Sequence, residues 1–148
     1  MQIVKLHHEN PSEVFDELYA LSCGPDARVN SYSAYVANSV KFLVKSCDER
    51  RQTQNCRIVS TGTHADIEDD YYGYLEEIIE LVYIKDYRVV LFKCKWFDTD
   101  RRRKHAIYKL HCISIDISRE AYKEDPFVFA TQVRQVFYID NPSKSNPN

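Results

Sequence analysis

The clearest alternation of hydrophobic and polar positions runs from Arg88 to Phe97, with the sequence RVVLFKCKWF. In an extended chain, successive side chains point to opposite sides. One side would carry Arg88, Val90, Phe92, Cys94 and Trp96. The segment is rich in β-branched and aromatic residues and contains neither glycine nor proline. This pattern predicts a β-strand.

The preceding segment, residues 73–84, has two interpretations. Its apolar residues recur at the spacing of an amphipathic helix, at Leu75, Ile78, Ile79 and Val82. We prefer a strand, because Tyr83–Tyr87 is too short and too apolar to connect a helix to the next strand. We therefore expect residues 73–84 to pair with residues 87–97 in a hairpin, and the helical alternative stays open for residues 74–84.

Shorter alternating segments predict further strands, at residues 29–33, 35–37, 40–44, 57–60, 107–110, 111–117 and 127–140. Residues 46–55 are predicted to be a polar loop, and residues 61–70 a connector rich in threonine, glycine and acids. The pattern favours a mainly β (α+β) fold, a small antiparallel barrel or rolled sheet of the SH3 or BAH kind, with an N-terminal helix. Trp96, Phe92 and Phe137 should belong to one core.

The domain organisation follows from the same pattern. Residues 1–26 are predicted to be an N-terminal helical extension, with an apolar stripe formed by Val14, Phe15, Leu18, Tyr19 and Leu21. Cys23-Gly24-Pro25 should end the helix, because proline cannot continue it. Residues 27–140 would form a single β-rich domain, and residues 141–148 a disordered tail.

Composition adds limits. A hydrophobic content of 44% over 148 residues indicates a folded protein, and the formal net charge of −2 gives no overall attraction to nucleic acid or to an anionic membrane. No apolar stretch approaches the ~20 residues of a membrane span, and no signal peptide is evident. Five cysteines, an odd number without a close pair, favour a reducing compartment. We expect a nuclear or otherwise cytoplasmic protein that is not secreted and does not contact a membrane.

No motif for catalysis, metal binding or a cofactor occurs: C-x-x-C, G-x-G-x-x-G, G-K-[ST] and G-x-S-x-G are all missing. We therefore expect no enzyme, no metal and no cofactor. The segment from Ala65 to Ile84 contains seven acids and neither lysine nor arginine. Acids that follow one another in a loop rarely converge on a metal ion, so the segment would be a solvated acidic surface or a docking surface for a basic peptide.

Aromatic residues next to these acids suggest a partner-binding site. Ring faces attract cations, so acids and rings together could bind a lysine-rich or arginine-rich segment, although aromatic residues more often fill a core. The predicted partner-binding residues are Asp66, Glu68, Asp69, Asp70, Tyr72, Tyr74, Glu76 and Glu80. In a regular strand Glu76 and Glu80 would lie on the same side as Tyr74.

The main basic concentration is Arg101, Arg102, Arg103 and Lys104. Such a run could serve nuclear import or contact nucleic-acid phosphates. A solubilising hairpin tip would explain the same residues, and the neighbouring Asp98 and Asp100 weaken the local positive field.

Several short motifs follow one another along the chain in a fixed order. They comprise Gly24-Pro25, Val29, Tyr32, Tyr35, Asn38, Phe42, Thr53-Gln54-Asn55, Tyr71-Tyr72-Gly73, Phe92, Cys94, Trp96, Asp125-Pro126-Phe127-Val128, Gln132 and Gln135-Val136-Phe137-Tyr138. With them, residues from about 20 to 140 resemble a plant domain of unknown function found near the C-terminal end of En/Spm (CACTA) type transposon proteins. Ser39 stands where that family usually has a glycine, which puts a tight glycine turn before Val40 in doubt.

The resemblance implies a transposon origin and no chemistry, because the family has no assigned activity. We expect a non-enzymatic, transposon-derived interaction module that binds a protein or chromatin partner. The alternative is a DNA-binding accessory domain of a transposase. The oligomeric state, and whether the chain is a fragment of a larger protein, stay open.

Overall fold

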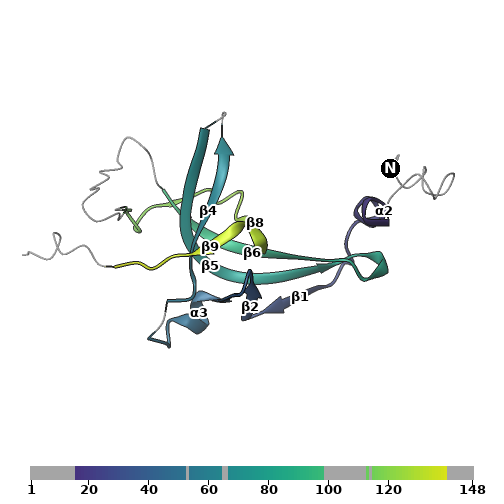
Figure 1. The fold of residues 1–148 in the computed structure, drawn as a ribbon, viewed down its shortest axis with the longest axis horizontal. Coiled ribbons are helices and arrows are strands. Elements are labelled where there is room, and N and C mark those ends of the chain that lie inside the picture. The colour runs from purple at the N-terminus through teal and green to yellow at the C-terminus, as the bar shows by residue number, and fades with distance from the viewer. Residues whose placement is uncertain (1–15, 53, 65–66, 99–112, 114, 140–148) are drawn as a thin grey trace, which may run out of the picture.

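The protein is mainly β, as the sequence pattern predicts. The computed structural model describes residues 16–52, 54–64, 67–98, 113 and 115–139 (Figure 1). A seven-stranded sheet has the order β7-β6-β5-β4-β9, with β1 also pairing with β5 and β8 with β6, and β2 and β3 form a second sheet. The strands of the described part do not close into a barrel, so the open, rolled sheet is the architecture observed.

The elements are α2 (Asp16–Cys23), β1 (Val29–Tyr32), β2 (Ala34–Ala37), β3 (Val40–Leu43), α3 (Lys45–Asp48), β4 (Arg57–His64), β5 (Ile67–Val82), η2 (Ile84–Asp86), β6 (Arg88–Phe97), β7 (Glu120–Ala121), β8 (Phe127–Phe129), η4 (Ala130–Gln132) and β9 (Val133–Gln135). The described helix α2 ends at Cys23, and Gly24 follows with φ of 78°, as expected for a glycine that terminates a helix. The proposed start of this helix lies outside the described residues.

The long hairpin of β5 and β6 is the centre of the fold and confirms the strand interpretation of residues 73–84. The two strands are antiparallel, from Gly73 opposite Trp96 to Val82 opposite Arg88. The 3₁₀ turn η2 joins them. At the turn, Lys85 forms an ion pair with Asp16, which holds α2 at this end of the hairpin.

A β-bulge interrupts β5 at Glu76. Leu75 lies opposite Cys94 and Glu77 opposite Lys93, so Glu76 is the extra residue of the bulged strand. A bulge bends its strand and increases its twist. On the N-terminal side of the bulge β5 pairs with β4, and on the C-terminal side with β1 (Figure 1).

We call the part formed by β1, β6, β8 and residues 77–82 of β5 the long arm. Directly opposed residues of an antiparallel pair share one side of the sheet. The core side of the long arm carries Ile78 opposite Phe92, and Val128 of β8 opposite Phe92 on its other edge. The outer side carries Ile79 opposite Leu91, and Phe129 opposite Leu91.

The main core lies between the core side of the sheet and the β2–β3 hairpin. Its buried residues are Ala37, Phe42, Val44, Cys56, Ile58, Leu75, Ile78, Phe92, Cys94, Trp96, Ala130 and Val133. The ring of Phe92 packs edge-on against Phe42, at 5.2 Å between centroids, and against Tyr35, at 6.2 Å. The β2–β3 turn forms without a glycine, with positive φ at Asn38 (51°) and Ser39 (64°).

The prediction that Trp96, Phe92 and Phe137 share a core is right for two residues and wrong for the third. Trp96 and Phe92 are buried, whereas Phe137 is 72% exposed. The predicted strand over residues 127–140 is divided into β8, η4 and β9, and β9 ends at Gln135. The partner strand β4 begins at Arg57, which accepts a hydrogen bond from the Val136 amide, so no strand remains for Phe137 to pair with.

Three other segments differ from the predictions. The polar loop at residues 46–55 starts within the short helix α3. The connector predicted at residues 61–70 belongs mostly to two paired strands, because β4 continues to His64 and β5 begins at Ile67. The described residues of the segment 111–117 form no strand, and the strand predicted at residues 107–110 lies outside the described residues.

Candidate functional site

The acids predicted to bind a partner do not gather in one place. Glu68, Asp69 and Asp70 lie on the first half of β5, opposite Thr63, Gly62 and Thr61 of β4. The Thr61 hydroxyl donates a hydrogen bond to Asp70 Oδ1 at 2.7 Å. Asp66 lies outside the described residues.

The acids at the bulge lie further along the strand. Glu76 is the exposed bulge residue, and Glu77 is exposed and pairs with Lys93 at 3.7 Å. Lys93 therefore neutralises one of the two charges, and residues 71–75 of β5 separate both acids from those of the first half of the strand.

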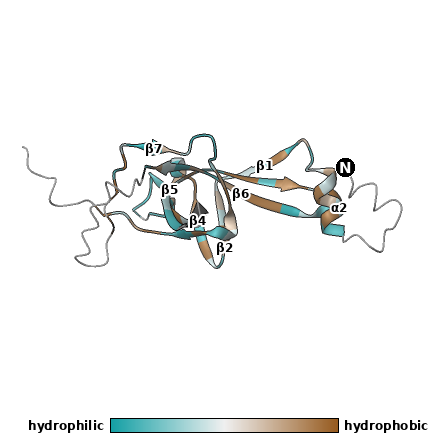
Figure 2. Ribbon diagram, turned by 90° about the horizontal axis from the view of Figure 1, so that it is seen from above, coloured by the Kyte–Doolittle hydropathy of each residue, from teal (hydrophilic) through white to brown (hydrophobic). Residues whose placement is uncertain are grey.

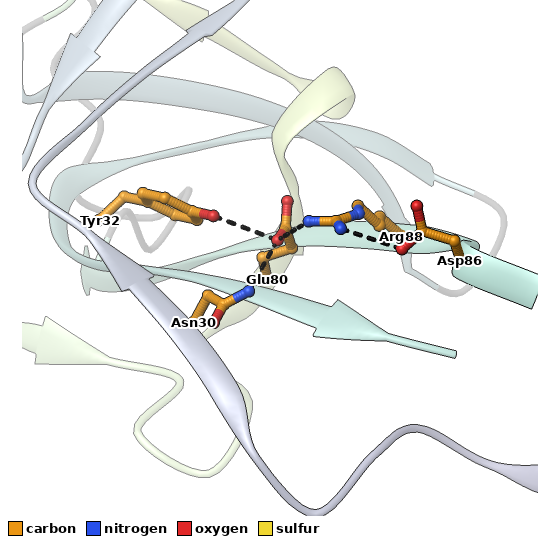
Figure 3. A network of polar contacts seen from close by, with 5 residues as sticks. All are labelled: Asn30, Tyr32, Glu80, Asp86 and Arg88. Carbon is orange, nitrogen blue, oxygen red and sulfur yellow. Dashed lines mark hydrogen bonds and ion pairs between the residues drawn. The ribbon is translucent and has the colours of Figure 1, made fainter. Parts of the chain in front are cut away.

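Glu80 belongs to a polar network on the core side of the long arm (Figure 3). Only 8% of this residue is exposed, and its Oε1 accepts hydrogen bonds from Asn30 Nδ2 (3.0 Å), Tyr32 Oη (3.1 Å) and Arg88 Nη1 (2.9 Å). Arg88 also pairs with Asp86 at 2.9 Å. The network ties β1 to the hairpin, and it leaves Glu80 neutralised within the protein.

The environment of Glu80 keeps it ionised. The Asn30 amide, then the Tyr32 hydroxyl and the Arg88 guanidinium, hold the pKa of Glu80 below its ordinary value, against the opposing effect of burial. The expectation that Glu80 shares a side with Tyr74 is wrong, because the bulge at Glu76 changes the phase of β5. Tyr74, opposite Lys95, lies on the outer side, and Glu80, opposite Val90, lies on the core side.

The ring of Tyr74 lies beside Phe97, at 5.9 Å between centroids, and close to three cations. Lys45 Nζ lies 4.1 Å from the centroid of the Tyr74 ring, Arg57 Cζ 5.8 Å and Lys95 Nζ 6.0 Å. These cations come from α3, β4 and β6, three segments far apart in sequence. The Glu120 carboxylate and then Tyr74 raise the pKa of Lys95, so that Lys95 stays charged at neutral pH.

Arg57 lies close to two tyrosine rings. Its Cζ is 5.0 Å from the centroid of Tyr138 and 5.8 Å from that of Tyr74. Tyr138 is fixed in turn, because its hydroxyl donates a hydrogen bond to the Gly73 carbonyl at 3.1 Å. Burial raises the pKa of Tyr138, so the ring stays uncharged. We call Lys45, Arg57, Tyr74, Lys95 and Tyr138 the cation corner.

Side chains behind the cation corner hold the segment that carries Tyr138. Gln54 Nε2 donates to the Tyr138 carbonyl (2.9 Å), and the Tyr138 amide donates to Gln54 Oε1 (2.8 Å), as a neighbouring strand would. Gln135 Nε2 donates to the Asn55 carbonyl at 3.1 Å. Gln54 and Asn55 thus meet the motif Gln135-Val136-Phe137-Tyr138, about eighty residues further along the chain, at this corner.

A buried carboxylate fixes the start of β4. Asp48 is 5% exposed, and its Oδ2 accepts hydrogen bonds from the backbone amides of Asn55 (2.8 Å) and Cys56 (3.0 Å). Burial and then the Asp48 carboxylate raise the pKa of the Cys56 thiol to about 12. Cys56 is therefore protonated and unreactive at neutral pH, and its role is structural.

Tyr72, the other predicted aromatic site residue, lies on the same side of the sheet, opposite Val59, which in turn lies opposite Arg134. Burial and the neighbouring Asp70 carboxylate raise the pKa of Tyr72. Sequence reasoning found both tyrosines and missed Lys45, Arg57 and Lys95, because the meeting of three single cations leaves no local pattern.

The other predictions about sites stay open. Arg101, Arg102, Arg103 and Lys104 lie outside the described residues. In the part of the chain that the structure describes, no group of three His, Cys, Asp or Glu side chains is placed to hold a metal ion. None of the described helices has the length and apolar character needed to cross a membrane.

Fold and site define a mainly β domain with a buried core on one side of its sheet and a cationic, tyrosine-rich corner on the other. Residues 79–147 match the family model described as Domain of unknown function (DUF4216). The match includes Lys95 and Tyr138, and it begins after Arg57 and Tyr74. No curated protein and no solved structure matches the chain. A transposon or plant origin and a likeness to SH3 or BAH domains stay predictions.

Proposed function

We propose that this protein is a non-enzymatic interaction module that binds another protein through the outer side of its long arm. The observation that carries the proposal is the apolar surface there, on the side of the sheet opposite the core. Soluble proteins rarely expose a continuous apolar surface unless it meets a partner.

Seven apolar side chains occupy neighbouring positions on this side. They are Val29, Ile79, Leu81, Val89, Leu91, Phe127 and Phe129. Val29 is 51% exposed, Phe127 45% and Phe129 50%. Figure 2 shows apolar stretches along the β1–β6 arm and on α2 at its end.

The short strand β8 has one side chain in the core and two on the outer side. Val128 packs against the main core, whereas its neighbours Phe127 and Phe129 point to the other side and are half exposed. An aromatic pair held on a regular strand, with a polar Lys93–Glu77 pair beside it, is a suitable anchor for a partner. The partner would be an amphipathic segment whose apolar side covers the outer side of the long arm.

The experiment selects displayed peptides on the purified protein and measures their affinity for two matched pairs of variants. Val29→Ser and Phe129→Ser alter the outer side, whereas Val36→Ser and Phe137→Ser alter valine and phenylalanine residues that are 61% and 72% exposed elsewhere. We expect apolar peptides whose binding weakens about tenfold or more in the first pair and is kept in the second. Equal affinity in all four variants would refute this docking surface. Self-association that disappears in the first pair would make a second copy the occupant.

A second titration tests whether the acidic segment binds a chromatin partner. Histone-tail peptides are titrated against the protein and against a variant with Glu68, Asp69 and Asp70 changed to Gln or Asn. Weaker binding in that variant would support the basic-peptide partner predicted from the sequence. Binding that instead follows the outer-side variants would assign the partner to the apolar surface alone.

A further inference from the structure

We propose that the cation corner binds a phosphate group carried on a phosphorylated segment of the protein partner. The corner lies on the same side of β6 as the apolar surface, because every second residue of a strand shares a side, and Val89, Leu91, Lys93 and Lys95 follow this spacing. One partner segment could therefore contact both. That the phosphate belongs to a protein rests on the proposed function, whereas the site itself does not.

Arg57 is the main phosphate-binding residue of the proposed site. Its guanidinium carbon lies 5.8 Å from the centroid of the Tyr74 ring and 5.0 Å from that of Tyr138, and Arg57 forms neither an ion pair nor a side-chain hydrogen bond with any of the described residues. The residue is partly exposed. A guanidinium next to two aromatic rings, without an acidic partner among the described residues, can offer its N–H donors for the two-point binding of a phosphate.

Lys45 and Lys95 supply the remaining positive charge. Each is paired with one exposed or partly exposed acid, Lys45 with Glu49 at 3.5 Å and Lys95 with Glu120 at 3.2 Å. Three cations thus lie near the ring of Tyr74, and two acids pair with them, which leaves one positive charge in excess. Like charges held this close repel one another, and a bound anion would relieve that repulsion.

The corner is rigid enough to act as a preformed site. The hydrogen bonds of Tyr138 to Gly73 and Gln54 fix one ring, and strand pairing fixes Tyr74 directly opposite Arg57. A site whose side chains are ordered before binding loses less conformational entropy when the ligand arrives.

The surroundings favour a single phosphate over a nucleic-acid strand. A nucleic-acid strand would carry further phosphates beyond the three cations of the corner, and the whole protein has a formal net charge of −2. This net charge gives no overall attraction to a long polyanion, whereas a single phosphate group needs only the cations of the corner. A phosphorylated side chain with about two negative charges matches the three cations of the corner.

The test is a titration of the ¹⁵N-labelled protein with inorganic phosphate and with O-phosphoserine, against chloride at the same ionic strength. Arg57→Gln and Lys95→Gln each remove one cation of the cation corner. Lys93→Gln removes a cation from the same side of β6 outside the corner and is the matched control. We expect amide shifts that concentrate at the cation corner, and an affinity about tenfold or more lower in Arg57→Gln, the loss expected for one charged hydrogen bond. Lys93→Gln should keep the affinity of the unaltered protein.

Unchanged affinity in Arg57→Gln, with its fold verified by the same spectra, would overturn the phosphate site. A short single-stranded oligonucleotide that binds more tightly than a phosphoserine peptide, with steep salt dependence, would replace the phosphoprotein by a nucleic acid. The Phe129→Ser variant separates the two proposals. Phosphate shifts that are unchanged in Phe129→Ser would uphold the phosphate site, whether this variant loses peptide binding, as the apolar docking surface requires, or keeps it, which would refute that surface alone.

Discussion

Substitution of Gly73 by alanine should be the most damaging change at any of the three glycines of this chain. Gly73 lies on β5 opposite Trp96, and the next pair along the hairpin is Tyr74 and Lys95 of the cation corner. A Cβ atom at this position would lie 2.3 Å from the carbonyl oxygen of Lys95 and 3.0 Å from Cε3 of Trp96. The first atom belongs to the backbone of a central strand, so the strands themselves must move apart.

The magnitude follows from what has to move. Overpacking of a dense core typically costs 1–3 kcal/mol, and a clash with backbone places Gly73→Ala at about 3 kcal/mol or more. The total stability of a domain of this kind is on the order of 5–15 kcal/mol, so the variant would be folded but clearly weakened. The shift would also disturb the Gly73 carbonyl that accepts the Tyr138 hydrogen bond, and with it the position of Arg57.

The other two glycines are controls for different effects. At Gly62 a Cβ atom would meet Cε2 of the Tyr71 side chain at 2.9 Å, and this half-buried ring can shift more easily than a backbone carbonyl. At Gly24 there is open space, but φ of +78° makes alanine cost about 1–2 kcal/mol. The expected order of destabilisation is therefore Gly73→Ala, then Gly24→Ala, then Gly62→Ala.

Urea unfolding followed by fluorescence of Trp96, the single tryptophan and a buried residue, measures all three variants. If Gly73→Ala and Gly62→Ala differ by less than about 0.5 kcal/mol, the close approach of the strands at Gly73 is wrong. A Gly73→Ala protein of full stability that loses phosphate binding would assign the glycine to the site and not to the core.

Three further results are expected. Trp96→Ala should lower the free energy of unfolding by about 3–5 kcal/mol in chemical denaturation, because a large buried side chain leaves a cavity; an unchanged unfolding midpoint would contradict its place in the core. Ser39→Gly should raise that free energy by about 1 kcal/mol, because glycine adopts the positive φ of this turn without strain, and a decrease would speak against the turn. Since the folded-state pKa of Glu80 is depressed, its contribution is present above the ordinary carboxyl value of 4.5 and is lost as pH falls below it. Melting temperatures from about pH 6 to pH 3 should therefore fall less steeply in Glu80→Gln than in the unaltered protein, and parallel curves would refute the network.

Much of the fold could be predicted because its signals are local. The alternation from Arg88 to Phe97 depends only on neighbouring residues, and the structure has a strand with Phe92, Cys94 and Trp96 buried. The helix end at Cys23 likewise depends on the conformational preferences of one or two residues.

Where the prediction was wrong, long-range pairing decided the result. Residues 61–70 read as a connector because they are polar, yet their backbone groups pair between β4 and β5 and form a hairpin. Phe137 alternates correctly for a buried strand but is exposed, because the strand that should continue to pair with it begins only at Arg57.

The sequence by itself determined a mainly β protein, its long hairpin, and the burial of Phe92 and Trp96, because burial and strand propensity leave a period of two along the chain. Only the tertiary structure decided which side of β5 each residue faces, since one bulge at Glu76 exchanges the sides of everything beyond it. It also decided that Tyr74 meets cations and not the acids next to it in sequence. Lys45, Arg57, Lys95 and Tyr138 come from four separate segments, and a site assembled across strands has no period that a single sequence can display.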